Sequence, residues 1–323
     1  MALPAGQMGP GELVTTAAVA RRYYLDGKSK VEIADEMKLS RFKVARLLET
    51  ARETGLVRIE IGFHGSIDVD RSSRLQDAYG LRRAVVVEVP DDDTPALRAT
   101  LGRCAAELLT EMVTPADVLG LAYARSVGAM AGTLTRLPSC SVVQLTGALS
   151  NPEMTESSIE LVHAVTRIAG GPAYFFYAPM IVSDASTASA LRQQPDVARA
   201  IAHFPSVTKA VVGIGGWGRG LSTVYDAVDA REQRRLARLG VVADVSGAFL
   251  DKDGEPVTAP LSERMIGVTA RDLAGVPEVL AIAYGVEKTQ AVRAALRSPL
   301  VDSLVTHSAM ARELLTLAEG DTA

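Results

Sequence analysis

The sequence has little cysteine, few aromatic residues and no long apolar run. Cys104 and Cys140 are the only cysteines among 323 residues, and their wide separation fits neither a disulfide framework nor a metal site. We therefore expect two reduced thiols in a cytoplasmic protein. No run of about 18 apolar residues occurs, which argues against a membrane span. Residues 1–12 lack the basic start and apolar centre of a secretory signal, and we interpret them as a disordered tail.

The charge is small overall but unevenly distributed. The net charge is −4, yet residues 1–64 carry ten basic and eight acidic residues, whereas the remainder carries 24 basic and 30 acidic residues. An acidic body of this kind argues against a protein coated in nucleic acid. It leaves room for a small basic module at the amino-terminal end that binds a polyanion.

Residues 13–64 show the pattern of three short helices followed by a strand. Ser29 and Glu32 have the spacing of a capping box, and Ser40 can cap the third helix. The third helix ends near Gly55, and "LVRIEI" after it alternates as a half-buried strand does. The apolar residues of this helix recur at helical spacing and predict a buried face: Val44, Leu47, Leu48 and Ala51.

The other face of the third helix is basic. Two helices joined by a tight turn and followed by a strand are typical of a winged helix-turn-helix, in which the later helix enters the DNA major groove. We interpret residues 13–64 as this DNA-binding domain. The alternative is a solvated helix face without a partner. The predicted DNA-binding residues are Ser40, Arg41, Lys43 and Arg46 on the helix, with Arg58 on the wing.

From about Ser66 onward, apolar strands alternate with helices. The strands include "DVLGLAY", "SVVQLTG", "KAVVGIG", "GVVADVSG" and "VLAIAYG". This alternation predicts an α/β domain with a Rossmann-like parallel sheet covered on both faces. Ligands of such sheets bind beyond the carboxyl ends of the strands, where loops meet helix amino termini.

Two of these strand ends carry candidate binding groups. Thr146 and Gly147 follow one strand, and exposed backbone N–H groups there could hold a phosphate. Lys288 lies at the start of a helix after another strand and could supply a positive charge to the same anion. The alternatives are an ordinary turn and a surface lysine.

From about Val14 to Leu317 the chain resembles the SorC family of bacterial transcriptional regulators. The resemblance is carried by the helix-turn-helix and by "VVQLTGA", "KAVVGIG", "VVADVSGAFLDKDGEPV", "SERMIGV" and "VPEVLAIAYGVEKTQAVRAALRSPLVDSLVTHSAMARELL". It implies that residues 65–320 form an effector and oligomerisation domain that binds phosphorylated sugars. The implied fold is like that of glucosamine-6-phosphate deaminase and ribose-5-phosphate isomerase. It also implies a homodimer or homotetramer on double-stranded operator DNA.

The resemblance further implies an effector site with the phosphate in the glycine-containing loop. The site residues carried over by position are Gln144, Thr146, Gly147, Ala148, Asp244, Arg264 and Lys288. For Arg264 the alternative is a salt bridge to a structural carboxylate.

The chain departs from the family pattern at several site positions. Ala148 replaces a second glycine in the phosphate loop, and Tyr284 replaces the first glycine of a late Gly-Gly pair, so both narrow the site. His307 stands where the family has aspartate, and either contacts the sugar or caps a helix. "AYAR" ends at Arg125 and keeps only the arginine of a Gly-Trp-Gly-Arg stretch.

The favoured function is a DNA-binding regulator of carbohydrate catabolism whose operator binding is modulated by a phosphorylated sugar. The alternative is a sugar-phosphate isomerase or deaminase with a fused DNA-binding module, and a third possibility is a structural oligomer scaffold. The four histidines form no spacing motif, and no acid–base pair is evident, so we expect no enzyme activity. We also expect no cofactor and no metal.

Overall fold

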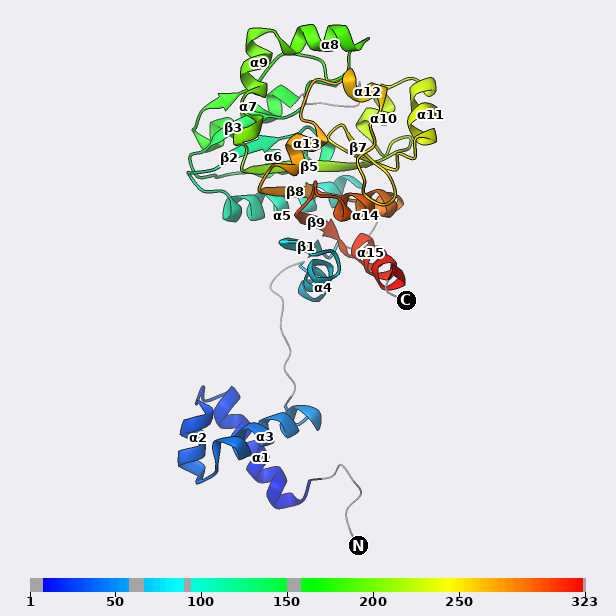
Figure 1. Ribbon diagram of the computed structural model, residues 1–323. Coiled ribbons are helices and arrows are strands. Elements are labelled where there is room, and N and C mark those ends of the chain that lie inside the picture. Colours follow the sequence, from blue (N-terminus) through cyan, green and yellow to red (C-terminus); the bar gives the residue numbers. More distant parts are fainter. Residues whose placement is uncertain (1–7, 58–66, 90–93, 150–157, 322–323) are drawn as a thin grey trace. The chain divides into compact units, whose positions relative to one another are not determined.

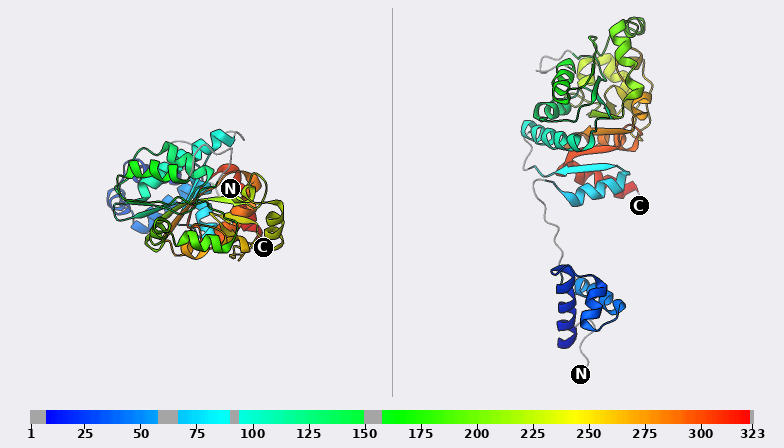
Figure 2. Two further views of the ribbon diagram at one scale, coloured as in Figure 1. Left: turned by 90° about the horizontal axis from the view of Figure 1, so that it is seen from above. Right: turned by 90° about the vertical axis from the view of Figure 1, so that its left-hand side faces the viewer.

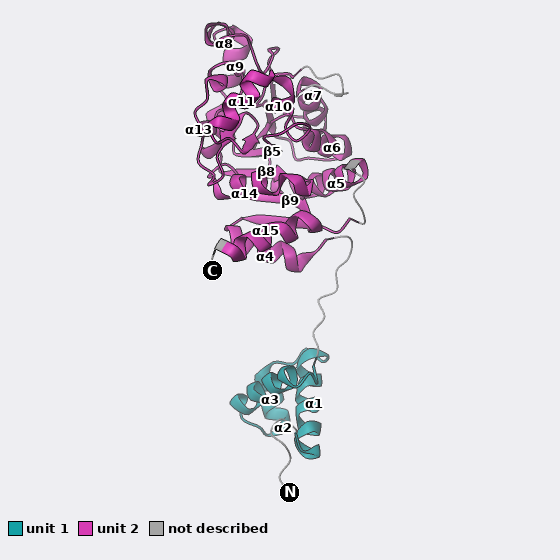
Figure 3. Cartoon of the chain, turned by 90° about the vertical axis from the view of Figure 1, so that its right-hand side faces the viewer, with its two compact units in different colours: residues 1–62 teal, residues 63–323 magenta. Residues whose placement is uncertain are grey.

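The computed structural model describes residues 8–57, 67–89, 94–149 and 158–321 (Figure 1). The chain forms two compact units, residues 1–62 and residues 63–323, which are coloured separately in Figure 3. In the part of the chain given above, no helix is both long enough and apolar enough to cross a membrane.

The first unit is built from three helices, α1 (Pro10–Tyr24), α2 (Lys30–Met37) and α3 (Arg41–Glu53). The capping box forms as predicted, because the Ser29 hydroxyl accepts from the Glu32 amide and the Glu32 carboxylate accepts from the Ser29 amide. The Ser40 hydroxyl accepts from the Lys43 amide and starts α3. The apolar face of α3 is buried against the other two helices: Val44, Leu47, Leu48 and Ala51.

The first unit differs from expectation at its amino-terminal end. Residues 10–12 belong to α1 rather than to a disordered tail, because proline at the first helical position already has the φ that the helix requires. The predicted wing, including Arg58, lies outside the described residues.

The second unit contains a sheet of parallel strands in the order β1-β9-β8-β5-β2-β3-β4. Their bounds are β1 (Arg83–Val87), β2 (Val118–Leu121), β3 (Ser141–Gln144), β4 (Ala173–Tyr174), β5 (Lys209–Gly216), β8 (Glu278–Ile282) and β9 (Ser303–His307). The predicted α/β class with a parallel sheet is therefore confirmed.

Helices cover both faces of this sheet (Figure 2). Neighbouring residues of one strand enter different cores, as the alternation of side chains along a strand requires: Val211 packs in one and Val212 in the other. Residues of α5 (Thr94–Met112), α6 (Arg125–Thr133) and α7 (Ser158–Ala169) build the core that contains Val211. Residues of α4 (Val69–Tyr79), α14 (Thr289–Arg297) and α15 (Ser308–Asp321) contribute to the core that contains Val212.

A strand pair departs from the predicted parallel pattern. The "VVADVSG" segment forms β6 (Ala243–Val245), which pairs antiparallel with the end of β5 and with β7 (Ala248–Leu250). A parallel partner needs a long crossover, whereas the two residues Ser246 and Gly247 connect β6 directly to β7. Both have positive φ, 56° and 94°, which matches a tight hairpin turn.

The second unit contains further short helices in addition to those that cover the sheet. They are α8 (Ala185–Arg192), α9 (Pro195–Ile201), α10 (Thr223–Ala227), α11 (Ala230–Arg238), α12 (Pro260–Glu263) and α13 (Ala270–Ala274), with short 3-10 helices η1 (Phe204–Ser206) and η2 (Val286–Lys288).

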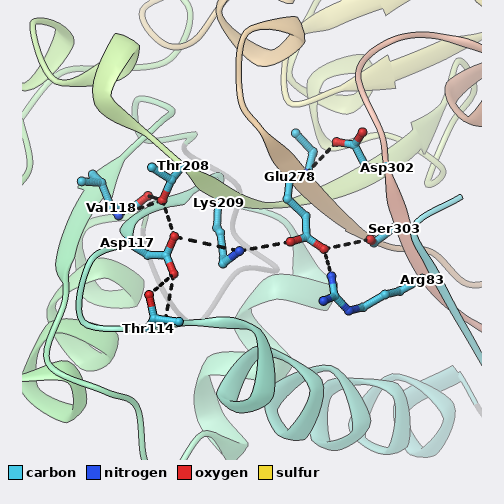
Figure 4. A network of polar contacts seen from close by, with 10 residues as sticks. Arg83, Thr114, Asp117, Val118, Thr208, Lys209, Glu278, Asp302 and Ser303 are labelled. Atoms are coloured by element: carbon cyan, nitrogen blue, oxygen red, sulfur yellow. Dashed lines mark hydrogen bonds and ion pairs between the residues drawn. The ribbon is translucent and has the colours of Figure 1, made fainter.

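A polar network ties the amino-terminal ends of the parallel strands together (Figure 4). Glu278, at the start of β8, is buried and pairs with Arg83 of β1 and with Lys209 of β5, the latter at 3.1 Å. Lys209 also lies 3.9 Å from Asp117, whose carboxylate accepts from the Thr208 hydroxyl at 2.7 Å. The charged side chains at this end of the sheet are therefore paired with one another.

Candidate functional site

A pocket lies at the carboxyl ends of β2, β5 and β8, where the strand order predicts a ligand site. It is lined by the segments Tyr123–Ser126, Gly213–Gly215, Leu221–Val224, Ile282 and Tyr284, together with Met180, Asp244, Ser246 and Lys288. Among the predicted effector residues, Asp244 and Lys288 line this pocket. Residues from widely separated parts of the chain therefore meet where the parallel strands end.

One side of the pocket is cationic. The Lys288 ammonium lies 4.8 Å from the centre of the Tyr284 ring, close enough for a cation–π contact. Burial, with Arg125 and Arg98 nearby, lowers the pKa of Lys288 to about 8, although the charge of Glu287 acts in the opposite direction. Arg125 begins α6 and pairs with Asp226 at 3.7 Å. Because the first amides of a helix lack partners within it, the start of α6 adds positive potential to the same side.

Arg98 of α5 adds a further cation behind Tyr284. Its guanidinium carbon lies 5.5 Å from the ring centre, so the Tyr284 ring contacts both Arg98 and Lys288. The Arg98 Nε atom is buried without a hydrogen-bond partner in the described parts of the chain. This concentration of positive charge favours an anionic group beside Lys288.

Asp244 lies on β6 and gives the pocket an acidic side. Its carboxylate accepts from the Ser222 hydroxyl at 2.8 Å and from the Gly247 amide at 2.7 Å. Burial raises the pKa of Asp244 to about 6, although these two hydrogen bonds act in the opposite direction. The pocket thus offers a cation for an anionic group and an acceptor for a hydroxyl group.

In the predicted phosphate loop, the amides of Gly147 and Ala148 are not free to bind a phosphate. The Gly147 amide donates to the Ile266 carbonyl at 2.9 Å, and the Ala148 amide donates to the Ala178 carbonyl at 2.9 Å. These partners are more than 25 residues away in sequence, so local pattern could not reveal them. The loop instead supports the pocket from behind, because the Thr146 hydroxyl accepts from the Tyr123 amide at 3.0 Å.

Gln144 and Arg264 also lie outside the pocket lining. The buried Gln144 side chain donates to the Thr146 carbonyl and accepts from the Phe176 amide, which fixes the loop conformation. Arg264 donates to the Val182 carbonyl at 2.9 Å and pairs with Glu232 at 3.4 Å, so the structural salt bridge is the arrangement observed.

His307 acts on the pocket indirectly. Its Nε2 atom accepts from the Gly285 amide at 3.3 Å, and the Gly285 carbonyl accepts from the Lys288 amide at 3.0 Å. The histidine therefore holds the segment that carries Lys288.

The predicted DNA-binding face of α3 is exposed to solvent. Arg41, Lys43 and Arg46 are exposed, and the Ser40 hydroxyl caps the helix end that precedes them. Phe42 between the two cations is 88% exposed. An apolar ring at this position has no role in the core of the unit, and it can contact a thymine methyl group in the major groove.

Sequence reasoning did not assign Arg98, Ser222 or Phe42 to a site, and it noted Arg125 only as a remnant of a motif. The available signal for Arg125 was its position four residues after the end of a buried strand. For Phe42 the signal was an aromatic residue on the polar face of a basic helix. Arg98 and Ser222 carry no local signal, because only the tertiary fold brings them to Tyr284 and Asp244.

Comparisons with known proteins agree with this architecture. The family described as "Putative sugar-binding domain" matches residues 65–316. The transcriptional regulator LsrR of Klebsiella pneumoniae is 32% identical over 311 residues, covering 94% of this chain and 93% of the relative. YjhU of Escherichia coli, named as an uncharacterized transcriptional regulator, is 31% identical over 308 residues, covering 91% of this chain and 92% of the relative.

A solved structure shows the same fold. The full-length sorbitol operon regulator SorC of Klebsiella pneumoniae aligns with a TM-score of 0.73 at 22% identity, covering 94% of this chain and 99% of that one. The matches define the class of protein, a DNA-binding transcriptional regulator with a sugar-binding domain. The chain belongs to the SorC family, which confirms the resemblance seen in its sequence.

Proposed function

We propose that this regulator binds a phosphorylated sugar in the pocket between Lys288 and Asp244, and that the ligand alters its affinity for operator DNA. The observation that carries the proposal is the division of the pocket into a cationic side and an acceptor side. A sugar phosphate has the matching division, a dianionic group at one end and hydroxyl groups along the rest. The phosphate lies beside Lys288 and the start of α6, and a sugar hydroxyl donates to Asp244.

The Thr146–Ala148 loop takes part as a support of the pocket. Gly147 packs against the backbone of Met180, which lines the pocket, and a Cβ atom on Gly147 would lie 2.7 Å from that backbone. The absence of a side chain at residue 147 therefore keeps the pocket wall in place. Gln144 holds the same loop, and Arg264 anchors the segment after Met180.

In the first unit we propose a winged helix-turn-helix with α3 in the major groove. Arg41 and Lys43 at the start of α3 contact base edges, Arg46 contacts the backbone, and Arg58 belongs to the wing. One such unit covers a half-site, so a homodimer or homotetramer fits operator binding better than a monomer does. We place this regulator in the cytoplasm, where its operator is accessible.

One observation favours an enzyme on the same fold as a second candidate. Asp244 and Lys288 line the same pocket, and burial raises the pKa of Asp244 to about 6 and lowers the pKa of Lys288 to about 8. Two such groups in one pocket can exchange protons with a bound sugar near neutral pH. The known relatives are named as regulators, which favours the first candidate. Incubation of ribose 5-phosphate and glucosamine 6-phosphate with the protein, followed by NMR, separates the two. Turnover that Asp244→Asn abolishes would establish the enzyme.

The test of the proposed site compares each phosphorylated sugar with its unphosphorylated form. A ligand present at 100 times its dissociation constant stabilises the protein by about 2.7 kcal/mol, which a thermal shift detects readily. We expect phosphorylated but not free sugars to stabilise the wild type, and Lys288→Ala to lose the shift. Lys252→Ala, which changes an exposed lysine outside the pocket lining, is the matched control and should keep it. Equal shifts with the free sugars would contradict the proposal.

A further inference from the structure

Helix α11 presents a basic face that neither the pocket nor α3 accounts for. Its sequence from Ala230 to Arg238 places four arginines at spacings of three, four and seven, which puts them on one side of the helix. All four are exposed: Arg231, Arg234, Arg235 and Arg238. In Figure 1 this helix (yellow) lies at the rim of the second unit.

The opposite side of α11 fixes this orientation. Leu236 is buried, the Gln233 amide group donates to the carbonyls of Tyr225 and Val228, and Glu232 pairs with Arg264. The Trp217 indole N–H donates to the Gln233 carbonyl at 3.1 Å. Because Glu232, the one acid within the helix, faces inward, the outward face carries four arginines and no acidic residue of the helix itself.

Little on the protein neutralises this face. Asp229 caps the helix, and the hydrogen bond from the Glu232 amide is the main reason why the pKa of the Asp229 carboxyl is lowered, with a smaller contribution from the charge of Arg231. In the portion of the chain that the structure covers, Arg234, Arg235 and Arg238 form no ion pair and donate no side-chain hydrogen bond. A cluster of this kind stands out on a body whose residues from 65 onward carry 24 basic and 30 acidic residues.

We infer that the arginine face of α11 binds the phosphate backbone of double-stranded DNA, in addition to the contacts of α3. Arginine suits this role because its planar fork matches phosphate oxygens and keeps its charge at any physiological pH. The seven helical steps from Arg231 to Arg238 rise about 10 Å, and about 10 Å of duplex axis carries about three phosphates of one strand. The contact carries no sequence information and adds affinity alone.

A second copy of the chain fits this face less well. In a two-fold symmetric contact the same patch meets itself, and four arginines would then oppose four arginines. The remaining protein partner is an acidic surface on another copy of the chain. Measuring both DNA affinity and oligomer mass distinguishes this partner from DNA.

The test uses the full chain and a random-sequence duplex, because phosphate contacts do not depend on sequence. The variant is Arg234→Gln/Arg235→Gln/Arg238→Gln, which leaves the anchored side of α11 unchanged. The control is Arg103→Gln/Arg167→Gln/Arg312→Gln, which removes the same charge from exposed positions on α5, α7 and α15. DNA affinity is measured between about 50 and 200 mM salt, and the mass in solution by sedimentation.

We expect the log–log salt slope of the α11 variant to become shallower by about two to three, since each lost phosphate contact changes it by about 0.9. The salt slope of the control variant should stay within about one of the wild-type slope. Equal slopes for the two variants would overturn the inference, as would an unchanged DNA affinity with a loss of oligomer mass, which would assign the face to a second copy. The thermal-shift measurement tests sugar binding separately, so a failure of the sugar proposal does not change the outcome of this DNA-binding test.

Discussion

Lys288 makes the proposed pocket sensitive to pH above neutrality. Burial, with Arg125 and Arg98 nearby, lowers the pKa of its ammonium group to about 8. A phosphate monoester has its second pKa near 6, so it remains a dianion from about pH 7 to pH 9. Over this range the lysine changes charge while the phosphate does not.

The expected size of the effect follows from this pKa. With a value of about 8, roughly nine tenths of the free protein carries the Lys288 charge at pH 7, and roughly one tenth does at pH 9. If the charged form alone binds the phosphate, the dissociation constant rises about tenfold, which is about 1.4 kcal/mol.

The assay is calorimetric titration of the wild type and three variants with the sugar phosphate that gives the largest thermal shift. Lys288→Ala should bind weakly with no pH dependence, and Lys288→Arg should keep the charge and lose the pH dependence, because arginine does not deprotonate. Lys252→Ala should follow the wild type. A flat wild-type profile from about pH 7 to pH 9, or a slope that survives in Lys288→Ala, would refute the reasoning.

Burial raises the pKa of Asp244 to about 6 from 3.8, so its contribution to stability is present below pH 3.8 and is lost as the pH rises through 6. Relative to the wild type, Asp244→Asn should therefore gain about 2–3 kcal/mol in urea-unfolding free energy between about pH 4 and pH 7, and a constant difference would contradict the assignment. Glu278→Ala leaves two cations of the network in Figure 4 without their buried partner and should destabilise by about 3–5 kcal/mol, with Glu278→Gln intermediate; a loss below about 1 kcal/mol would show that the network is not stabilising. Arg41→Ala and Lys43→Ala should each cost about 1–3 kcal/mol in operator affinity and relax sequence specificity, and a double variant that binds like the wild type would show that α3 is not the recognition helix.

Sequence patterns that span about four residues predicted the helix caps and the buried face of α3 in the first unit. The capping box at Ser29 and the cap at Ser40 depend on neighbouring residues alone, and both form as expected. The apolar stripe of α3 was equally readable, because a helix buries residues three and four apart together. The start of α1 at Pro10 was missed, because glycine and proline near residue 10 weakened the helical pattern there.

The effector pocket was only partly predictable, because its groups come from distant segments. Asp244 and Lys288 were carried over by family resemblance, and both line the pocket. The amides of Gly147 and Ala148 resembled a phosphate cradle in sequence, yet their partners are Ile266 and Ala178. A glycine after a strand does not reveal whether its amide is free, since that depends on which segment packs beside it.

The antiparallel β6–β7 pair has a related explanation. Its apolar residues are buried on both faces, as in the parallel strands, so composition alone does not separate the two cases. The tight turn at Ser246 and Gly247 carries the information, and serine is an uncommon residue at a positive φ of 56°.

The central claim is that a phosphorylated sugar in the Asp244–Lys288 pocket changes the affinity for operator DNA. The most direct measurement takes a duplex that the protein itself selects from a random-sequence pool and determines its affinity with and without each sugar phosphate. A coupling of about 1–3 kcal/mol, roughly a 5–150-fold change in affinity, is expected for the wild type. Lys288→Ala should bind the duplex as tightly as the wild type does without ligand, and should show no response. An unchanged wild-type affinity at saturating ligand, or a full response in Lys288→Ala, would contradict the claim.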